Sequence, residues 1–204
     1  MPRMRVHFRK SGYACFISHI DLPILFGRAA RRAGLVSEMT QGFSPHPRLA
    51  LGPPLPVGVV GLCEPAEFWF REWPEDGLAR WNRHLPPGIE LLEARAADGV
   101  SLHKLCAAAS YALEFSAAAD PRAAEAALRA ALMEMDALLG LDAEADSLRL
   151  SVRDLERAGP SRFVKILQEQ AVVSGWSEVA IARTAVGGWD EDERHVIPLT
   201  GESI

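Results

Sequence analysis

The chain opens with Arg3-Met4-Arg5-Val6-His7-Phe8-Arg9, in which apolar and polar side chains alternate. This alternation predicts a half-buried β-strand, because successive side chains of a strand point to opposite faces of the sheet. A helix is expected next, beginning at Ser18 or Asp21 and ending at Gly34. Pro23 fits only within the first turn of that helix. The fold therefore starts as a strand followed by a helix.

Three further strands and one helix complete the first half. We predict strands at Arg48–Leu51, Ala66–Trp73 and Ile89–Ala94, with a helix over about Glu75–His84. The resulting order β-α-β-β-α-β is that of the ferredoxin-like supersecondary pattern.

The second half repeats this order after a linking helix at Ser101–Ala109. Strands are predicted at Tyr111–Ser116, Leu148–Arg153 and Glu178–Val186, helices at Pro121–Asp136 and Pro160–Val173, and Leu138–Leu141 is ambiguous. We expect an α+β fold of two tandem ferredoxin-like units, whose strands either share one fused sheet or form two packed sheets. The expected domains are residues 1–98, residues 99–186 and an acidic flexible tail over residues 187–204.

Composition indicates an ordinary globular protein of 204 residues, 49% hydrophobic and 24% charged. Cys15, Cys63 and Cys106 are far apart, which predicts neither a disulfide framework nor a zinc motif. No run approaches the roughly 18 apolar residues of a membrane span, and Met1–Lys10 does not read as a signal peptide. We expect a cytoplasmic protein without a cofactor or a membrane partner.

Charge is distributed unevenly along the chain. The net charge is -5, yet residues 1–50 hold eight Lys or Arg against Asp21 and Glu38, which gives +6 there and −11 in the remainder. Such asymmetry indicates a face for an anionic partner. Mutual attraction between a basic and an acidic half explains it equally well.

The candidate ligand site lies in the basic first quarter. Motifs such as GxGxxG, GxxxxGK[ST], GxSxG and HExxH are absent. A helix N-terminus attracts anions, arginines neutralise phosphates, and an aromatic ring in a proline-stiffened loop can stack on an unpaired base. The predicted ligand-binding residues are Ser18, His19, Arg28, Arg31, Arg32, Phe43, Ser44, His46 and Arg48.

Each candidate also has a purely structural role open to it. Ser18 suits a helix cap, Phe43 suits a plug in the core, and the arginines suit a solvated helix face. His19 and His46 can be read as the acid–base pair of a ribonuclease. A metal site would fit no standard ligand spacing; its members would be His19, Asp21, His46 and Cys63.

Four segments in combination resemble one protein family. They are Phe16-Ile17-Ser18-His19-Ile20-Asp21-Leu22, Arg28-Ala29-Ala30-Arg31-Arg32-Ala33-Gly34-Leu35, Gln41-Gly42-Phe43-Ser44-Pro45-His46-Pro47-Arg48 and Pro54-Leu55-Pro56-Val57-Gly58. Over about Arg3–Leu92 the chain resembles the radical-SAM-linked domain of unknown function, which occurs alone or fused C-terminal to radical SAM proteins. Pro23 and Gly27 depart from the family's usual helix, and the radical SAM cysteine triplet is absent, so this chain cannot hold that iron–sulfur cluster.

The resemblance implies a radical SAM protein as partner and a connection with RNA or ribosome metabolism, and it transfers no catalytic residue. We expect a non-catalytic RNA- or ribosome-associated binding module, accessory to a radical SAM enzyme. Two alternatives stay open: a metal-independent endoribonuclease using His19 or His46, and a protein that binds a phosphate-containing small molecule at the Ser18 helix end. A single site requires that the Arg28, Arg31 and Arg32 face lie near the loop of residues 41–48.

Overall fold

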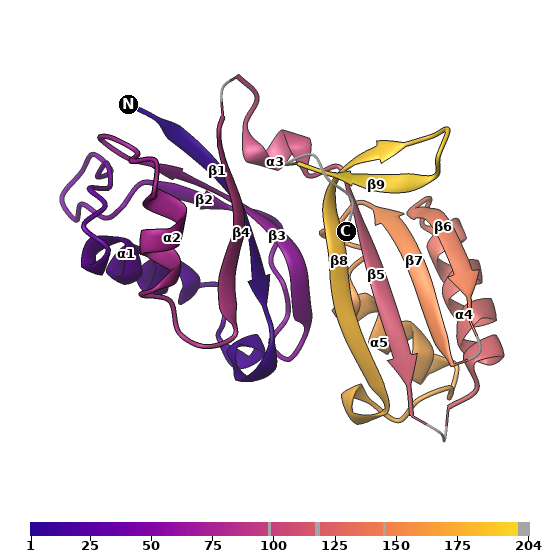
Figure 1. Cartoon of the computed structure of the whole chain (residues 1–204). Helices are drawn as coiled ribbons and strands as arrows, with labels where there is room; N and C mark the ends of the chain where they lie inside the picture. The colour runs from indigo at the N-terminus through magenta and orange to yellow at the C-terminus, as the bar shows by residue number, and fades with distance from the viewer. Residues whose placement is uncertain (98, 117–118, 145, 200–204) are drawn as a thin grey trace.

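The computed structural model describes residues 1–97, 99–116, 119–144 and 146–199. These residues form a mixed α+β fold in which nine strands make one hydrogen-bonded sheet and five α-helices accompany it (Figure 1). The predicted α+β class is confirmed. Strands from both halves share one sheet, which is one of the two arrangements that the sequence allows.

In the first half, the strand neighbours follow the order β4-β1-β3-β2, and every neighbouring pair is antiparallel. Phe8 and Phe68, on adjacent strands, both pack edge-on against Phe26 of the first helix, with ring centroids 5.1 and 5.4 Å from it. The alternating apolar side chains of the first strand therefore bury against the helices, but the prediction of a half-buried strand is wrong, because Arg5 and His7 between them are buried too. The elements are β1 (Arg3–Lys10), a 3-10 turn (Gly12–Phe16), α1 (Leu22–Arg32), β2 (Leu49–Leu51), β3 (Val60–Trp69), α2 (Gly77–Asn82) and β4 (Ile89–Ala96).

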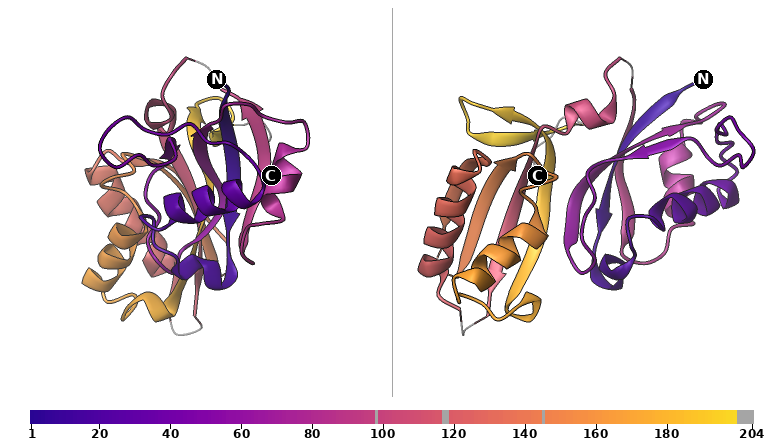
Figure 2. Two further views of the ribbon diagram at one scale, coloured as in Figure 1. Left: turned by 90° about the vertical axis from the view of Figure 1, so that its left-hand side faces the viewer. Right: turned by 180° about the vertical axis from the view of Figure 1, so that it is seen from behind.

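In the second half, the strand neighbours follow the order β8-β5-β7-β6, again antiparallel throughout. Helices α4 and α5 cover one face of these strands, as α1 and α2 cover one face of the first set (Figure 2). The elements are α3 (Leu102–Leu105), β5 (Ala108–Phe115), α4 (Pro121–Glu134), β6 (Leu138–Ala143), β7 (Ser147–Arg153), α5 (Pro160–Glu169), a 3-10 turn (Trp176–Glu178), β8 (Val179–Asp190) and β9 (His195–Pro198).

The two halves meet where β3 and β8 pair in parallel, with Gly61 opposite Arg183. Arg183 is buried, forms an ion pair with Glu64, and donates to the carbonyl oxygen of Pro53 at 2.7 Å. Pro53 belongs to the loop of residues 52–58, which we call the strap. Leu55 of the strap packs into the core of the second half, so the strap ties the halves together.

Several element boundaries differ from the predictions, and two of the differences are large. The strand expected at Ala66–Trp73 is β3, which begins six residues earlier, at Val60. Gly61 and Pro65 are of residue types that are uncommon inside a strand, yet both lie in the ladder, where they pair with residues of β1. The linking helix expected over Ser101–Ala109 is a single turn, because Ala108 already pairs in β5. The ambiguous segment Leu138–Leu141 lies in strand β6.

The expected loose tail from residue 187 onward is wrong for residues 187–199. β8 continues to Asp190 and pairs with β9, with Gly187 opposite Pro198. The acidic run builds the turn between these strands: the Asp190 carboxylate accepts the backbone N–H groups of Asp192 and Glu193 at 2.9 and 3.0 Å. Residues 200–204 lie outside the described part of the chain.

Candidate functional site

Helix α1 and the loop that follows it are held together by a close contact between Gly27 and Pro47. A Cβ atom at Gly27 would lie 3.0 Å from the Pro47 Cγ atom, which is tighter than normal packing. The glycine that weakens α1 therefore lets the loop rest on the helix. Pro23 stands in the first turn of α1, as predicted.

Residues 39–47 form a narrow hairpin, which we call the α1 hairpin. Met39 and Pro47 form a β-bridge at its base, and the Thr40 N–H donates to the His46 carbonyl oxygen at 2.8 Å. Phe43 stands at its tip and is fully exposed to solvent. The alternative that Phe43 plugs the core is therefore wrong, and the ring is free to contact a ligand.

A groove of about 470 Å³ runs between α1 and the base of the α1 hairpin. Its surface is mostly apolar: Ile24, Val36 and Met39 remain 55%, 46% and 44% exposed. Arg28 and Arg31 of α1 also line it. The structure thus brings two of the three predicted helix arginines beside the predicted loop, as a single site requires.

Most of the basic side chains of residues 1–50 already have partners within the protein. Four of the eight bases are in ion pairs: Arg3 and Arg5 with Glu67, Arg9 with Glu90, and Arg48 with Glu38. Lys10 is buried and donates to the Ile17 carbonyl oxygen, and Arg32 donates to that of His84. Within the described ranges, only Arg28 and Arg31 of these eight form neither an ion pair nor a side-chain hydrogen bond.

Arg48 is positioned by its neighbours. Its guanidinium lies over the Trp69 ring, 4.5 Å from the centroid, and its Nη1 is 3.1 Å from Glu38. These contacts fix Arg48 at the base of the α1 hairpin and compensate its charge. Its charge is therefore less available to an anionic ligand than the sequence suggested.

Ser18 and His19 lie before α1, away from its polar face. α1 begins at Leu22, and the Ser18 hydroxyl donates to the Asp21 carboxylate at 2.5 Å. The prediction that Ser18 caps the helix is wrong, and the carboxylate beside it disfavours a phosphate there. His19 is half-buried in a small cavity with Lys10 and Glu64. Burial, and then the charge of Arg183, lower the pKa of His19.

His46 has its own hydrogen bonds within the α1 hairpin. Its Nδ1 lies 3.1 Å from the Thr40 Oγ1 and 3.2 Å from the carbonyl oxygen of Ser44. It therefore belongs to a different environment from His19, whose neighbours are Lys10 and Glu64. In the part of the chain that the structure describes, no group of three or more His, Cys, Asp or Glu is arranged to hold a metal ion.

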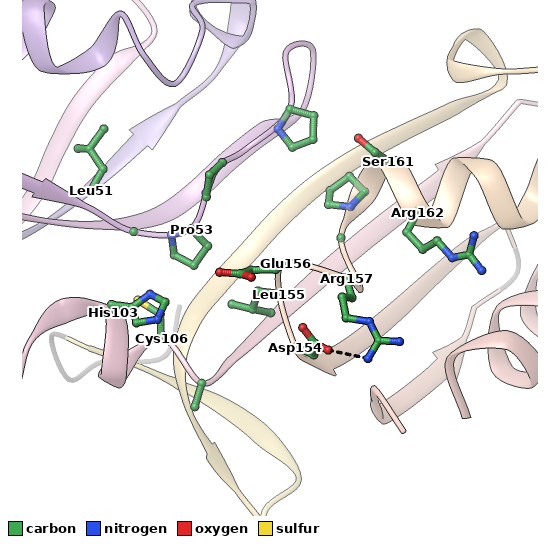
Figure 3. Close-up of a pocket in the computed structure, with 16 residues that line it drawn as sticks. Leu51, Pro53, His103, Cys106, Asp154, Leu155, Glu156, Arg157, Ser161 and Arg162 are labelled. Atoms are coloured by element: carbon green, nitrogen blue, oxygen red, sulfur yellow. Dashed lines mark hydrogen bonds and ion pairs between the residues drawn. The ribbon is translucent and has the colours of Figure 1, made fainter. Parts of the chain in front are cut away.

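One large cavity among the described residues was not predicted as a site. It is a cleft of about 930 Å³ between the strap, the α3 segment and the start of α5 (Figure 3). Arg157 pairs with Asp154 at 3.4 Å, and Glu156 and Arg162 add one charge of each sign. Acidic and basic groups balance there, so the cleft has no marked preference for an anion. The only sequence signals were Pro53, Pro54 and Pro160, which indicated turns or a helix start.

Residues 3–139 match the model of a family described as an uncharacterized protein conserved in bacteria, DUF2344. The chain belongs to this family. The match covers all of the α1 region and extends past Leu92 into the second half. No curated protein matches the chain. No helix among the described residues is long and apolar enough to cross a membrane.

Proposed function

We propose that this chain is a non-catalytic module that binds single-stranded RNA on the surface formed by α1 and the α1 hairpin. The proposal is carried by two features of this surface: α1 bears two uncompensated arginines, Arg28 and Arg31, and the hairpin packed on α1 bears the fully exposed ring of Phe43. Proteins that bind single-stranded nucleic acid combine cations, which contact the phosphates, with exposed aromatic rings, on which the bases stack.

The shape of the α1 hairpin supports this proposal. The Met39–Pro47 bridge and the Gly27–Pro47 contact hold its base on the helix. A ring presented from a preformed loop loses less conformational entropy on binding than one presented from a flexible chain. The position of the Phe43 ring is therefore set before a ligand binds.

The separation of the two histidines favours binding over catalysis. Cleavage of RNA needs an acid and a base close to one phosphate, whereas His19 and His46 have separate sets of neighbours. A lowered pKa also makes His19 a poor carrier of the proton that an acid must give. We infer that the protein presents RNA and leaves it uncut.

The context we propose rests on the sequence resemblance. A radical SAM protein, which would act on the RNA or on the ribosome, is the proposed partner.

We also propose that each half is a ferredoxin-like unit, which the β-α-β-β-α-β order and the antiparallel strand orders support. Three free cysteines support a cytoplasmic location, since thiols stay reduced there.

An RNA titration at several salt concentrations tests the proposal. Two arginines of α1, Arg28 and Arg31, are available for phosphates, so the log–log salt slope for a single strand should be about −1.4, from roughly −0.7 per phosphate. The variant Arg28→Glu/Arg31→Glu should bind at least tenfold more weakly than the wild type at low salt, a change of about 1.4 kcal/mol or more. Its stability should change little, because both side chains are exposed.

The matched control is Lys104→Glu/Arg122→Glu, which makes the same change of charge at two exposed positions of the second half. It should bind like the wild type. Equal losses in the two variants would show that only net charge matters. Full affinity in a folded Arg28→Glu/Arg31→Glu protein would exclude α1 as the RNA-binding surface.

A further inference from the structure

We propose that the groove between α1 and the α1 hairpin accepts one unstacked nucleotide of the RNA strand, with the base on the apolar surface and its phosphates on Arg28 and Arg31. This inference rests on the proposed function and adds a prediction about the substrate class: an open single strand binds, and a duplex does not.

The floor of the groove fits a flat apolar ring. It is built by side chains that remain roughly half exposed although they are large and apolar, namely Ile24, Val36 and Met39. Exposed apolar surface gathered in one concave place usually marks a binding site. Gly27 and Pro47 add a hard, ring-shaped edge, because Pro47 lies directly on the helix backbone.

The rim of the groove supplies the charge that a nucleotide needs. Arg28 and Arg31 are three residues apart on α1, so their side chains project from the same face. Two neighbouring cations without anionic partners repel one another, and a bound phosphate relieves that repulsion. An uncharged apolar peptide would leave both arginines uncompensated. Charge complementarity therefore favours a phosphate-bearing occupant.

The size of the groove limits how much of the ligand can enter. At about 470 Å³ it lies in the range of roughly 300–1,000 Å³ that is typical of small-ligand sites. A base that is still paired cannot turn its ring into such a groove without leaving its stack, and unstacking costs a few kcal/mol per step. A single strand has already left the duplex stack. Phe43 lies four residues beyond Met39, at the tip of the same hairpin, where it can stack on a neighbouring base.

The test compares a short single-stranded RNA, the same sequence closed into a hairpin duplex, and a free mononucleotide. The variant Ile24→Ser/Met39→Ser removes the apolar floor without changing the charge. We expect it to bind the single strand at least about fivefold more weakly than the wild type does. The matched control Met133→Ser/Ile197→Ser alters two similarly exposed apolar residues elsewhere and should keep full affinity.

The outcomes separate this inference from the function on which it rests. Suppose that the single strand binds Ile24→Ser/Met39→Ser as tightly as the control Met133→Ser/Ile197→Ser, yet binds Arg28→Glu/Arg31→Glu more weakly. That result overturns the base subsite and leaves RNA binding intact. Equal affinity of the wild type for strand and duplex overturns the subsite too. Tight binding of the mononucleotide alone would make the groove a small-molecule site. No binding of any RNA would remove the proposed function itself.

Discussion

Gly27 lies in the middle of α1, where glycine costs about 1 kcal/mol relative to alanine. The contact with Pro47 accounts for it, since a Cβ atom at this position would lie 3.0 Å from the Pro47 Cγ atom and crowd the base of the α1 hairpin. Arg28, the next residue, then lines the groove that this contact shapes. One unfavourable residue in a helix thus creates the surface on which the proposed function depends.

His7 is a second residue whose position has a measurable consequence. It is buried on β1, with its Nδ1 3.1 Å from the Cys63 Sγ. Burial, helped by the nearby charges of Arg95 and Arg5, lowers the pKa of His7 to about 4. Because the unfolded state takes up a proton near pH 6.5 and the folded state does not, stability is lost as the pH falls from about 6.5 towards 4.

The size of this effect follows from the shift. Between pH 7.5 and 5 the contribution of His7 to the free energy of unfolding should fall by about 2 kcal/mol. Urea unfolding at both pH values measures this loss. The variant His7→Gln carries no titrating ring, so it should lose correspondingly less over the same interval. An identical loss in the wild type and in His7→Gln would show that His7 is not the source.

At the scale of elements, the strap joins the two halves. Leu55 is buried in the core of the second half although it belongs to a loop of the first. Leu55→Ala should therefore lower the free energy of unfolding by about 2–5 kcal/mol, as is typical of a core leucine. Val57→Ala, at an exposed position of the same strap, is the control and should change it by less than about 0.5 kcal/mol. If both variants were equally stable, the strap would not be part of the core.

Most elements could be predicted from the sequence because their patterns are local. The alternation of apolar and polar residues around Val6 predicts β1, and the helical spacing of apolar residues predicts α1. The start of β3 could not be predicted, because glycine and proline are depleted inside strands, and Gly61 and Pro65 are accommodated only by their pairing with β1. The β8–β9 hairpin was missed for a similar reason, since its acidic turn suggests a flexible tail.

The candidate site was predictable in part. The sequence placed Arg28, Arg31 and Phe43 correctly among exposed residues, and Arg28 and Arg31 line the groove at the base of the α1 hairpin. It could not show that Arg48 is compensated by Glu38, or that the Ser18 hydroxyl is engaged by Asp21. Ion pairing depends on which distant residues the fold brings together. Arg3 and Arg5, for example, pair with Glu67, which is more than 60 positions away in the sequence.

At the scale of the whole molecule, a second cleft is an alternative RNA-binding site to the surface formed by α1 and the α1 hairpin, which we call the α1 surface. The helix-free faces of the two strand sets border this second cleft of about 470 Å³, lined in part by Arg9, Arg149 and Arg194. Arg9 and Arg149 are already in ion pairs with Glu90 and Glu144. Among the residues that line this cleft, the one large aromatic residue is Tyr111, which is buried and therefore cannot stack on a base. We therefore expect RNA to use the α1 surface.

The most direct test is to crosslink the wild-type protein to a single-stranded RNA containing photoreactive uridines and to identify the attached peptides by mass spectrometry. Our account predicts crosslinks within residues 23–47, with Phe43 and the groove residues Ile24 and Met39 among them. A Gly27→Ala protein, in which the added Cβ atom crowds Pro47 at the base of the α1 hairpin, should crosslink less. Crosslinks concentrated around Arg149 and Arg194, or in the cleft between the strap and α5, would contradict the central claim.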